Sequence, residues 1–294
     1  MANRRSFDDE TPYARRGRLT EHERARLAAL REDAYEPEIP GDRYSTWDTG
    51  ERGPRPYPDW LVTELAAVDT ELGVLKAGKE ADVHLLRRGL PDGSRACLLA
   101  AKRYRSNEHR QFHRDASYLE GRRMRRSRET RAMANRTSFG RNLIAEQWAV
   151  AEFGYLCRLW TVGLPVPYPV QRNGTELLLE FLGEEDGTAA PRLEQLRPDA
   201  DELESLWFQA RRALELLAGE GLAHGDLSPY NVLVHRGRLV LIDLPQVVDL
   251  FANPAGPEFL ARDAANLARW FTARGLDVDV PSLTSELSER AGLR

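Results

Sequence analysis

The segment from His224 to Asp243 constrains this chain more than any other part of its sequence. It begins with His224-Gly225-Asp226-Leu227-Ser228-Pro229-Tyr230-Asn231 and ends with Leu241-Ile242-Asp243. Between these ends, apolar residues alternate on both sides of Arg236-Gly237, the pattern of two antiparallel strands joined by a tight turn. The sequence therefore predicts a β-hairpin, with Asn231 before its first strand and Asp243 at the end of its second.

Three side chains of this segment carry the chemistry of phosphate transfer. The carboxylate of Asp226 can orient and deprotonate an attacking hydroxyl, while Asn231 and Asp243 offer the hard oxygen ligands that Mg²⁺ needs beside ATP phosphates. Positioning and charge neutralisation supply most of the catalysis in this reaction, so few residues are needed. An ordinary turn would explain the His-Gly-Asp triplet alone, but the whole string with its downstream Ile-Asp favours a kinase-type catalytic loop.

A kinase-type site also needs a lysine on an N-terminal strand and a glutamate on a following helix. The apolar run Leu98-Leu99-Ala100-Ala101-Lys102 ends in such a lysine. Farther on, apolar residues recur at helical intervals, at Val150, Phe153, Leu156 and Leu159. This pattern predicts a helix on which Glu152 pairs with Lys102, with Glu146 as the alternative partner.

The stretch from Leu75 to Val83 lies between two apolar segments, as expected of a loop whose backbone amides cover the phosphates. It contains one glycine, Gly78, whereas a glycine-rich kinase loop has the pattern G-x-G-x-x-G. The pattern by itself fits a plain hairpin turn equally well.

Further segments follow one another along the chain. They are Gly78-Lys79-Glu80-Ala81, Trp148 to Glu152, Gly163-Leu164-Pro165-Val166-Pro167, Glu180-Phe181-Leu182-Gly183, Ala190-Pro191-Arg192-Leu193, His224 to Asn231, Ile242-Asp243 with Gln246, and Glu258-Phe259-Leu260 with Asp263 and Asn266. Taken together, they resemble the RIO family of atypical protein kinases, closest to its Rio-one subgroup. The resemblance covers about Trp60 to Gly275.

The resemblance implies an α+β fold of the two-lobed protein-kinase type. A small β-rich N-lobe would occupy about 59–182, and a mainly helical C-lobe without the usual substrate-docking helices about 183–294. The implied activity is that of a serine/threonine protein kinase that uses ATP and Mg²⁺, with Mn²⁺ as an alternative, and that also phosphorylates itself. Phosphate on the metal-binding aspartate, seen in family members, would make Asp243 a phospho-acceptor and the activity partly an ATPase.

The resemblance also assigns the site residues. The catalytic set is Asp226, Lys102, Glu152 and Asp243, and the metal ligands are Asn231 and Asp243. The ATP-binding set is Lys76, Ala77, Gly78, Lys79, Glu80, Val83, Lys102, Leu179, Glu180, Leu182 and Asn231. Within it, the backbone of Glu180 and Leu182 would hold the adenine, with Leu179 behind it.

The chain departs from the family pattern at several positions. Lys76 and Ala77 stand where the family usually has Ser-Thr, so hydroxyl phosphorylation of this loop is not available here. Leu244-Pro245 replaces the usual Val-Ser, and Asp82 and His84 replace Asn and Tyr. None of these changes removes a proposed catalytic group.

Regions outside the motifs agree with a two-lobed enzyme. A chain of 294 residues with 41% hydrophobic content can bury a large core. No apolar run is long enough to cross a membrane, and the N-terminus lacks an apolar signal region. The two cysteines, Cys97 and Cys157, lie among apolar residues and are expected to be buried free thiols, which favours a cytoplasmic protein.

Two helices are expected outside the motifs, together with a polar N-terminal extension. Residues 1–58 are rich in charged residues, Pro and Gly, and are expected to be mostly disordered. Leu61, Leu65 and Val68 predict a helix from Trp60 onward. A long apolar stripe predicts a core helix that ends at Gly219 and Gly221. The stripe consists of Leu203, Leu206, Trp207, Ala210, Leu214 and Leu217.

An arginine-rich insert occupies residues 103–141, in a chain whose formal net charge is −4. Charge runs are most often solvated loops, which is the default interpretation here. The functional alternative is attraction to RNA or a ribosomal particle, where cations bind phosphates. The resemblance supports this alternative, since RIO proteins of archaea and eukaryotes act in maturation of the small ribosomal subunit.

Two other functions remain open at this point. Small-molecule phosphotransferases of the aminoglycoside or choline kinase type also use His-Gly-Asp and Asn, but Gly78-Lys79-Glu80-Ala81 and Glu258-Phe259-Leu260 argue against them. An assembly factor that binds RNA or ribosomes and uses ATP only as a conformational signal is the second. The sequence does not predict the protein substrate.

Overall fold

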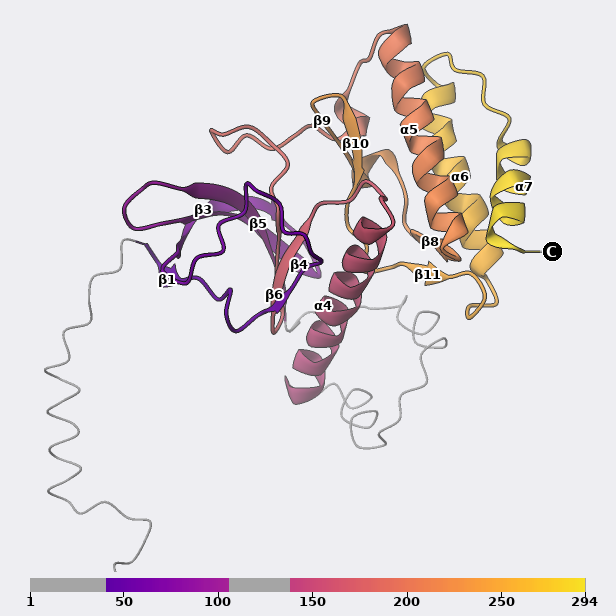
Figure 1. Ribbon diagram of the computed structural model, residues 1–294. Helices are drawn as coiled ribbons and strands as arrows, with labels where there is room; N and C mark the ends of the chain where they lie inside the picture. Colours follow the sequence, from indigo (N-terminus) through magenta and orange to yellow (C-terminus); the bar gives the residue numbers. More distant parts are fainter. Residues whose placement is uncertain (1–40, 106–137, 294) are drawn as a thin grey trace, which may run out of the picture. The chain divides into compact units, whose positions relative to one another are not determined.

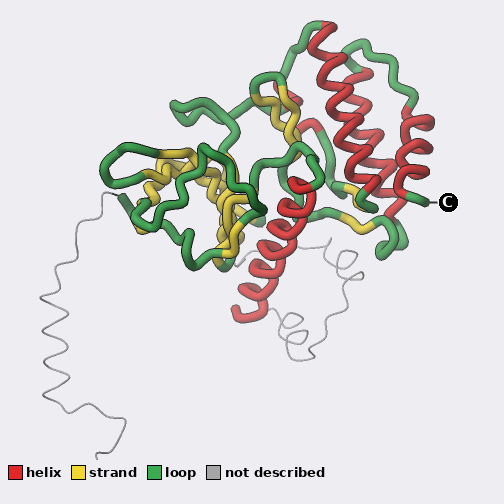
Figure 2. The backbone as a smooth tube through the Cα atoms, in the orientation of Figure 1, coloured by secondary structure: helices red, strands yellow, loops and turns green. Residues whose placement is uncertain are grey.

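The computed structural model of the chain describes residues 41–105 and 138–293, shown as a ribbon in Figure 1. All of the described residues belong to one compact unit, Ile39–Arg294. Its N-terminal part is a sheet and its C-terminal part is mainly helical, as the backbone trace coloured by secondary structure in Figure 2 makes plain. The predicted α+β fold is therefore confirmed.

Seven antiparallel strands form the sheet in the described residues, in the order β1-β3-β4-β5-β7-β6-β2. Their bounds are β1 Arg43–Tyr44, β2 Glu51–Arg52, β3 Val68–Ala77, β4 Ala81–Gly89, β5 Ala96–Tyr104, β6 Pro169–Asn173 and β7 Glu176–Glu180. A tight turn at Gly78 joins β3 to β4. A Cβ atom there would lie 2.5 Å from the carbonyl oxygen of Ala81, so the close approach of the two strands requires glycine.

Residues 41–58 have a defined structure that includes two short strands of the sheet, so the expectation of disorder is wrong for this part of 1–58. Strand β1 pairs with β3, and β2 pairs with β6, so both add to its edges. Trp47 between them is only 5% exposed and packs edge-on against Tyr57. Aromatic burial and strand pairing thus outweigh the polar composition of the segment. Residues 1–40 lie outside the described part of the chain.

The helix expected from Trp60 is also wrong, because the segment before β3 consists of turns and extended backbone. Leu61 and Val62 are buried, but Leu65 is 71% exposed, and Val68 already begins β3. The apolar spacing therefore reflects separate contacts with the sheet and not one face of a helix.

The helical part begins with α4, Ser138–Thr161, which contacts β5, β6 and β7 of the sheet. Its buried side is formed by Ala145, Ala149, Phe153, Leu156 and Leu159. Val150, which the periodicity had placed on this side, is 47% exposed. Helices α5 Ala200–Gly219, α6 Gly256–Thr272 and α7 Val280–Ala291 follow and pack against one another (Figure 1).

Short elements connect the sheet to these helices. Strands β9 Val232–His235 and β10 Arg238–Leu241 form the predicted hairpin, with Arg236 and Gly237 at positive φ in its turn. Strand β8 Leu222–Ala223 pairs with β11 Val248–Asp249, and two 3-10 turns lie at η1 Leu193–Gln195 and η2 Pro229–Asn231. The hairpin confirms where the sequence placed Asn231 and Asp243.

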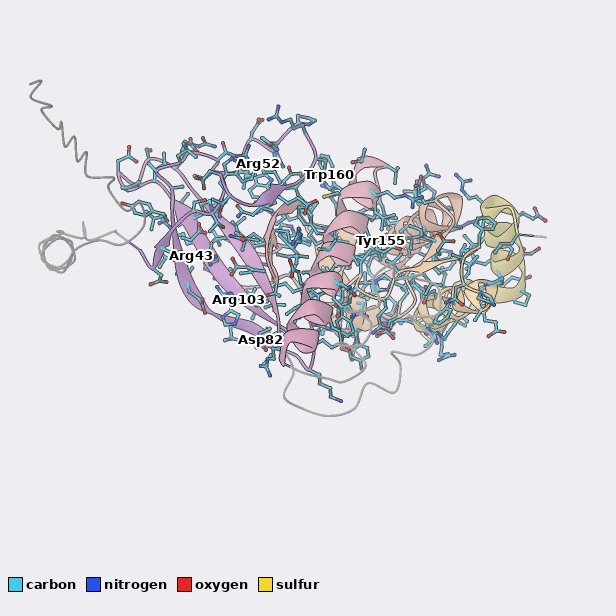
Figure 3. The ribbon with its side chains drawn as sticks, turned by 90° about the horizontal axis from the view of Figure 1, so that it is seen from below. Arg43, Arg52, Asp82, Arg103, Tyr155 and Trp160 are labelled. Carbon is cyan, nitrogen blue, oxygen red and sulfur yellow. The ribbon has the colours of Figure 1, made fainter. Side chains whose placement is uncertain are left out.

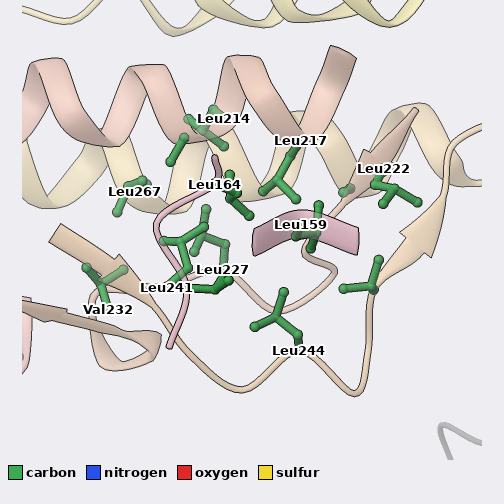
Figure 4. Close-up of a cluster of buried hydrophobic side chains, with 14 of the residues drawn as sticks. Leu159, Leu164, Leu214, Leu217, Leu222, Leu227, Val232, Leu241, Leu244 and Leu267 are labelled. Carbon is green, nitrogen blue, oxygen red and sulfur yellow. The ribbon is translucent and has the colours of Figure 1, made fainter. Parts of the chain in front are cut away.

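One hydrophobic core joins the end of α4 to the C-terminal helices and to residues 224–244 (Figure 4). Leu159 and Leu164 come from α4 and the residues after it, and Leu214 and Leu217 come from α5. Residues 224–244 join the same core through Leu227, Val232, Leu241 and Leu244. Burial on this scale, at about 25 cal/mol per Å² of apolar surface, fixes the backbone on which the polar residues of the site stand.

None of the described helices is both long enough and apolar enough to cross a membrane.

Candidate active site

A cavity of about 690 Å³ lies among the predicted site residues. Its lining comes from the β3–β4 turn, strand β5, helix α4, the segment after β7 and the residues around Asp226 and Asp243. The predicted ATP-binding residues in the lining are Lys76, Gly78, Lys79, Glu80, Val83, Lys102, Leu179, Glu180 and Leu182. Ala77 and Asn231 are not part of it. The volume is within the range of small-ligand and cofactor sites, about 300–1,000 Å³.

Lys102 lies on β5 with its ammonium between two carboxylates. Its Nζ atom is 2.6 Å from Oε1 of Glu152 and 2.8 Å from Oδ1 of Asp243, and the residue is 7% exposed. Burial by itself would lower the pKa of Lys102, but the two carboxylates outweigh burial and raise the pKa above its ordinary value. The ammonium therefore stays charged beside the cavity.

Glu152 is the glutamate that the structure pairs with Lys102, whereas Glu146 is exposed on the same helix. The Glu152 carboxylate is 1% exposed and has further partners. The Tyr104 hydroxyl donates to its Oε2 atom, and the backbone N–H of Leu244 donates to Oε1 at 3.2 Å. Burial and the neighbouring Glu152 raise the pKa of Tyr104 well above its ordinary value, so the phenol remains a donor.

Tyr104 was not recognised from the sequence. It lies two residues after Lys102, and residues at i and i+2 of a strand face the same side, so strand alternation was the signal that could have identified it. Its contact with Glu152 means that β5 holds the glutamate at two points.

Asp226 stands in a loop that is fixed by buried hydrogen bonds while its own side chain is exposed. The carboxylate of Asp263, on α6, accepts from the backbone N–H of Gly225 at 2.8 Å and from that of Leu227 at 3.0 Å. Gly225 has a φ of +84°, and a Cβ atom there would lie 2.2 Å from the Gln246 carbonyl oxygen. The loop therefore needs glycine at this position.

Two arginines hold the carbonyl groups at the ends of the same loop. Arg262 donates to the carbonyl oxygen of Gly225, and Arg192 donates to that of Tyr230 at 2.5 Å. Asp263 and Arg192 belong to the motif segments, but the sequence assigned them no role, and Arg262 was not singled out. Their function as loop supports depends on which backbone groups the fold brings beside them.

Asn231 lies in the turn η2 and is 7% exposed. Its Nδ2 atom donates to the carbonyl oxygen of Asp226 at 2.9 Å and lies 3.5 Å from the Asp226 carboxylate. The backbone N–H of Ile242 donates to the Asn231 carbonyl at 3.0 Å, which ties the two ends of the β9–β10 hairpin together. The structure thus brings Asp226 and Asn231 into direct contact and connects Asn231 to the residue before Asp243.

Asp243 follows this hairpin with a φ of +67°, a left-handed conformation uncommon for residues other than glycine, asparagine and aspartate. Its Oδ1 atom contacts Lys102, and its Oδ2 atom lies 3.7 Å from Nζ of Lys76. Burial would raise the pKa of Asp243, but Lys102 first, then Lys76 and His224, outweigh it and lower the pKa to about 2. Asp243 is therefore ionised at neutral pH.

The donor set at this end of the cavity fits Mg²⁺. Because the amide nitrogen of Asn231 donates to a carbonyl group, its amide oxygen is left as an acceptor, and Asp243 supplies a carboxylate. In the described residues, no cluster of three or more His, Cys, Asp or Glu side chains could hold a metal by itself. Two protein oxygens, completed by phosphate and water, are the usual environment of Mg²⁺ beside a nucleotide.

The segment after β7 is fixed by backbone hydrogen bonds. The N–H of Glu180 donates to the Tyr168 carbonyl at 2.9 Å, and the N–H of Ala190 donates to that of Leu182 at 2.9 Å. Leu179, Glu180 and Leu182 line the cavity, so they stand where an adenine ring could contact them. Their role in binding adenine stays a prediction.

The arginine-rich insert 103–141 is covered only at its ends by the described residues, 103–105 and 138–141. Its residues 106–137, and with them the predicted RNA contact, lie outside the described part of the chain. Arg103 itself is part of the sheet surface, where it and Arg43 both bond to Glu176, at 2.7 and 2.5 Å. Figure 3 labels both arginines beside the sheet.

Comparison with known proteins identifies the family. The RIO domain family model matches residues 96–283. The RIO-type serine/threonine-protein kinase Rio1 of Haloferax volcanii is 32% identical over 216 residues, which are 74% of this chain and 68% of that protein. Serine/threonine-protein kinase RIO1 of Caenorhabditis elegans is 38% identical over 132 residues, 45% of this chain and 26% of that protein.

Among solved structures, the Rio2 kinase–ADP/Mg²⁺–phosphoaspartate complex from Chaetomium thermophilum is similar in fold. Its TM-score is 0.55 at 19% identity, and the match covers 76% of this chain and 62% of that one. At this identity the likeness shows the fold alone, and the fold is that of a two-lobed kinase. Together with the family match, these findings show that the chain belongs to the RIO-type serine/threonine protein kinases, in the Rio1 subgroup.

Proposed function

We propose that this protein transfers the γ-phosphate of ATP to a serine or threonine hydroxyl of a protein, with Mg²⁺, or Mn²⁺ in its place, as the metal. The observation that supports this most strongly is the ammonium of Lys102, which contacts both Glu152 and Asp243 at a cavity that Asp226 also lines. This supports the proposal because a fixed positive charge, a carboxylate that could bind metal and an exposed carboxylate that could act as the base all border one cavity.

Each group has a defined task in this proposal. Lys102, oriented by Glu152, neutralises charge on the nucleotide phosphates, and the exposed Asp226 accepts the proton of the acceptor hydroxyl. Asp243 and Asn231 are the residues that would hold Mg²⁺, which neutralises the phosphate charge when bound. The backbone hydrogen bonds from Gly225 and Leu227 to Asp263 keep the loop with Asp226 in place, so little reorganisation is needed during the reaction.

The nucleotide would lie along the rest of the cavity. Leu179, Glu180 and Leu182 would contact the adenine, and the turn with Gly78, together with Val83, would cover the phosphates. Ala77 and Asn231 do not line the cavity, so their contact with the nucleotide has less support than that of the other nine residues.

A parallel reaction at Asp243 is part of the proposal. An Asp243 oxygen would attack the γ-phosphorus, the bond to the ADP oxygen would break, and water would later hydrolyse the acyl phosphate. The result is ATP hydrolysis in two steps. This reaction is supported by the carboxylate's ionised state at the cavity and by the phosphoaspartate named for the similar Rio2 structure.

The partners beyond ATP are proposed from the sequence. The arginine content of residues 103–141 suits a phosphate-rich partner such as RNA or a ribosomal particle. We further propose a cytoplasmic location, which the two free cysteines Cys97 and Cys157 support. Membership of the RIO family argues against phosphorylation of small metabolites.

The decisive experiment measures transfer of labelled γ-phosphate from Mg-ATP. The purified wild type, Asp226→Asn and Asp243→Asn are compared, with auto-phosphorylation, a generic basic protein and free phosphate as the three readouts. We expect Asp226→Asn to lose transfer to protein by about 10²–10⁴-fold, the usual contribution of a positioned base, while it still binds ATP. Unchanged turnover in this variant would refute the role of Asp226, and ATP binding with no labelled protein would favour an ATP-switched assembly factor.

A further inference from the structure

Lys76 forms a second ionic contact with Asp243, in addition to that of Lys102. Its Nζ atom lies 3.7 Å from Oδ2 of Asp243, whereas Lys102 contacts Oδ1 at 2.8 Å. Each oxygen of the carboxylate therefore faces a different lysine. Lys76 comes from the end of β3, two residues before Gly78 in the turn, so the pair connects the turn to the residue after the β9–β10 hairpin.

The two lysines are held very differently. The Lys102 side chain is 9% exposed and also bonds to the buried Glu152. The Lys76 side chain is 45% exposed, and within the described residues its ion pair is with Asp243. If a further cation approaches the Asp243 carboxylate, Lys76 is the lysine that would be displaced. Its contact with Asp243 is longer than that of Lys102, and its side chain is more exposed. Lys102 is also held by its ion pair with Glu152.

A metal ion on Asp243 would be such a cation. Like charges a few ångströms apart repel one another, so a divalent ion and the Lys76 ammonium would compete for the Oδ2 atom of Asp243. The phosphate chain of a nucleotide bound in the cavity would offer Lys76 another anionic partner, because Lys76, Gly78 and Lys79 all line this cavity.

We infer that Lys76 exchanges partners during the reaction cycle. In the nucleotide-free protein it pairs with Asp243, and when nucleotide and metal bind it moves to the terminal phosphates. Lys76 thus competes with the metal for Asp243 and at the same time supplies positive charge to the nucleotide. This inference rests on the proposed function.

The inference predicts that loss of the Lys76 charge changes two affinities in opposite directions: the affinity for metal and the affinity for metal-free nucleotide. Removing the Lys76 charge frees the Asp243 carboxylate, so a metal ion should bind the nucleotide-free protein more tightly. The same change removes a cation from the phosphate site, so nucleotide without metal should bind more weakly. A residue that merely supports the turn would weaken both equilibria when it is replaced.

The test uses the full chain with Lys76→Gln, which removes the positive charge and keeps a flexible polar side chain that is one bond shorter than that of lysine. Lys76→Arg keeps the charge. Arg87→Gln is the matched control, since it removes one positive charge from an exposed site on β4 that is not part of the cavity. Binding of Mn²⁺ alone is followed by electron paramagnetic resonance, and binding of a non-hydrolysable ATP analogue in EDTA by calorimetry, with thermal unfolding as the check on folding.

We expect Lys76→Gln to bind Mn²⁺ about two- to fivefold more tightly and the metal-free analogue about three- to tenfold more weakly, the scale of a partly exposed charge pair. Lys76→Arg should stay near the wild type, and Arg87→Gln should change neither constant. The inference is overturned if Lys76→Gln shifts both constants in the same direction or leaves both unchanged.

A separate control distinguishes this inference from the proposed function. If Asp243→Asn binds Mn²⁺ as well as the wild type does, Asp243 is not the metal ligand, and both the metal site and the competition are wrong. Failure of the wild type to bind the analogue even with Mg²⁺ would overturn the proposed function as well. Normal nucleotide and metal binding that is indifferent to Lys76 would overturn this inference alone.

Discussion

Asp263 accepts a hydrogen bond from the backbone N–H of Gly225 at 2.8 Å, across 38 residues of sequence. The second oxygen of the same carboxylate accepts from the N–H of Leu227 at 3.0 Å, so Asp226 lies between two anchored residues. Asp263 is 1% exposed. The position of the proposed base thus depends on a buried carboxylate of α6 that does not itself line the cavity.

Asp263→Asn tests this support. An amide can accept from one of the two N–H groups, but its own NH₂ group would face the other, which leaves a buried donor without an acceptor at a cost of about 1–3 kcal/mol. We expect a lower free energy of unfolding, and a fall in kcat for phosphate transfer with little change in KM for ATP. Denaturant unfolding and steady-state kinetics measure these. Glu258→Gln, at an exposed site in the first turn of α6, is the control and should leave the free energy of unfolding and kcat unchanged. An equal effect of Glu258→Gln would contradict the supporting role of Asp263.

Glu152→Gln tests the orientation of Lys102. The neutral amide cannot balance the ammonium, so Lys102 should move toward Asp243, its other carboxylate partner. Moving the Lys102 ammonium away from the nucleotide phosphates should lower the rate of phosphate transfer on the order of 10²-fold. The assay is γ-phosphate transfer at saturating ATP. Glu146→Gln, at an exposed site on the same helix, should retain wild-type transfer, and the reverse ranking would reassign the pair to Glu146.

The lowered pKa of Asp243 predicts a pH dependence of stability. Its value falls from about 3.9 in the unfolded chain to about 2 in the folded one, so between these values the unfolded state binds more protons. The stabilisation by Asp243 is therefore present above pH 4 and is lost as the pH falls toward 2. Because the side chain is 34% exposed, solvent screening reduces it to about 1 kcal/mol.

Asp243→Asn provides the measurement for this pH effect. Asparagine tolerates the positive φ at this position, so the substitution mainly removes the charge. Denaturant unfolding of both proteins between pH 6 and pH 2.5 should show a stability difference that shrinks by about 1 kcal/mol at the acid end. A difference that is the same at every pH would mean that Asp243 is not stabilised by the two lysines.

A buried ion pair in the sheet gives a prediction about stability alone. Arg88, on β4, makes a bidentate contact with Asp69 of β3 at 2.7 and 2.9 Å and donates to Gln171 of β6 at 2.9 Å. Both charged side chains are fully buried. Asp69→Asn leaves the guanidinium without a counter-charge and should cost about 3–5 kcal/mol of the free energy of unfolding.

The exposed pair of Arg95 and Glu64, at 2.5 Å, is the matched control for this prediction. Water screens such a pair, so Glu64→Gln should change the free energy of unfolding by less than about 1 kcal/mol. Urea unfolding followed by tryptophan fluorescence measures both variants. Similar losses in the two variants would show that burial of the Arg88 pair does not determine its contribution.

The structure of residues 224–243 could be predicted from the sequence because it is local. The hairpin from Val232 to Leu241 follows from alternation and from a turn at Gly237, and it places Asn231 and Asp243 at its two ends without help from the rest of the fold. The α+β class and the RIO resemblance likewise come from the order of segments along the chain. Lys102 at the end of an apolar strand run belongs to the same kind of local information.

Other features depend on contacts between residues far apart in sequence. Leu65 has the spacing of a helix face and Val150 that of a buried stripe, yet both are exposed, because the neighbouring elements do not cover them. Conversely, the largely polar segment 41–58 has a defined structure, because Arg43–Tyr44 and Glu51–Arg52 pair with strands of the sheet. Periodicity states which residues share a side of an element, whereas burial depends on what packs against that side.

The sequence by itself determined which groups are present: the carboxylates of Asp226 and Asp243, the amide of Asn231, and a lysine and glutamate for an ion pair. Only the tertiary structure decided their partners. Glu152 and not Glu146 reaches Lys102, Asp263 holds the loop of Asp226, and Lys76 lies beside Asp243. The physical reason is that a hydrogen bond or ion pair depends on distances of a few ångströms, and between residues far apart in the sequence those distances are fixed by the packing of the core.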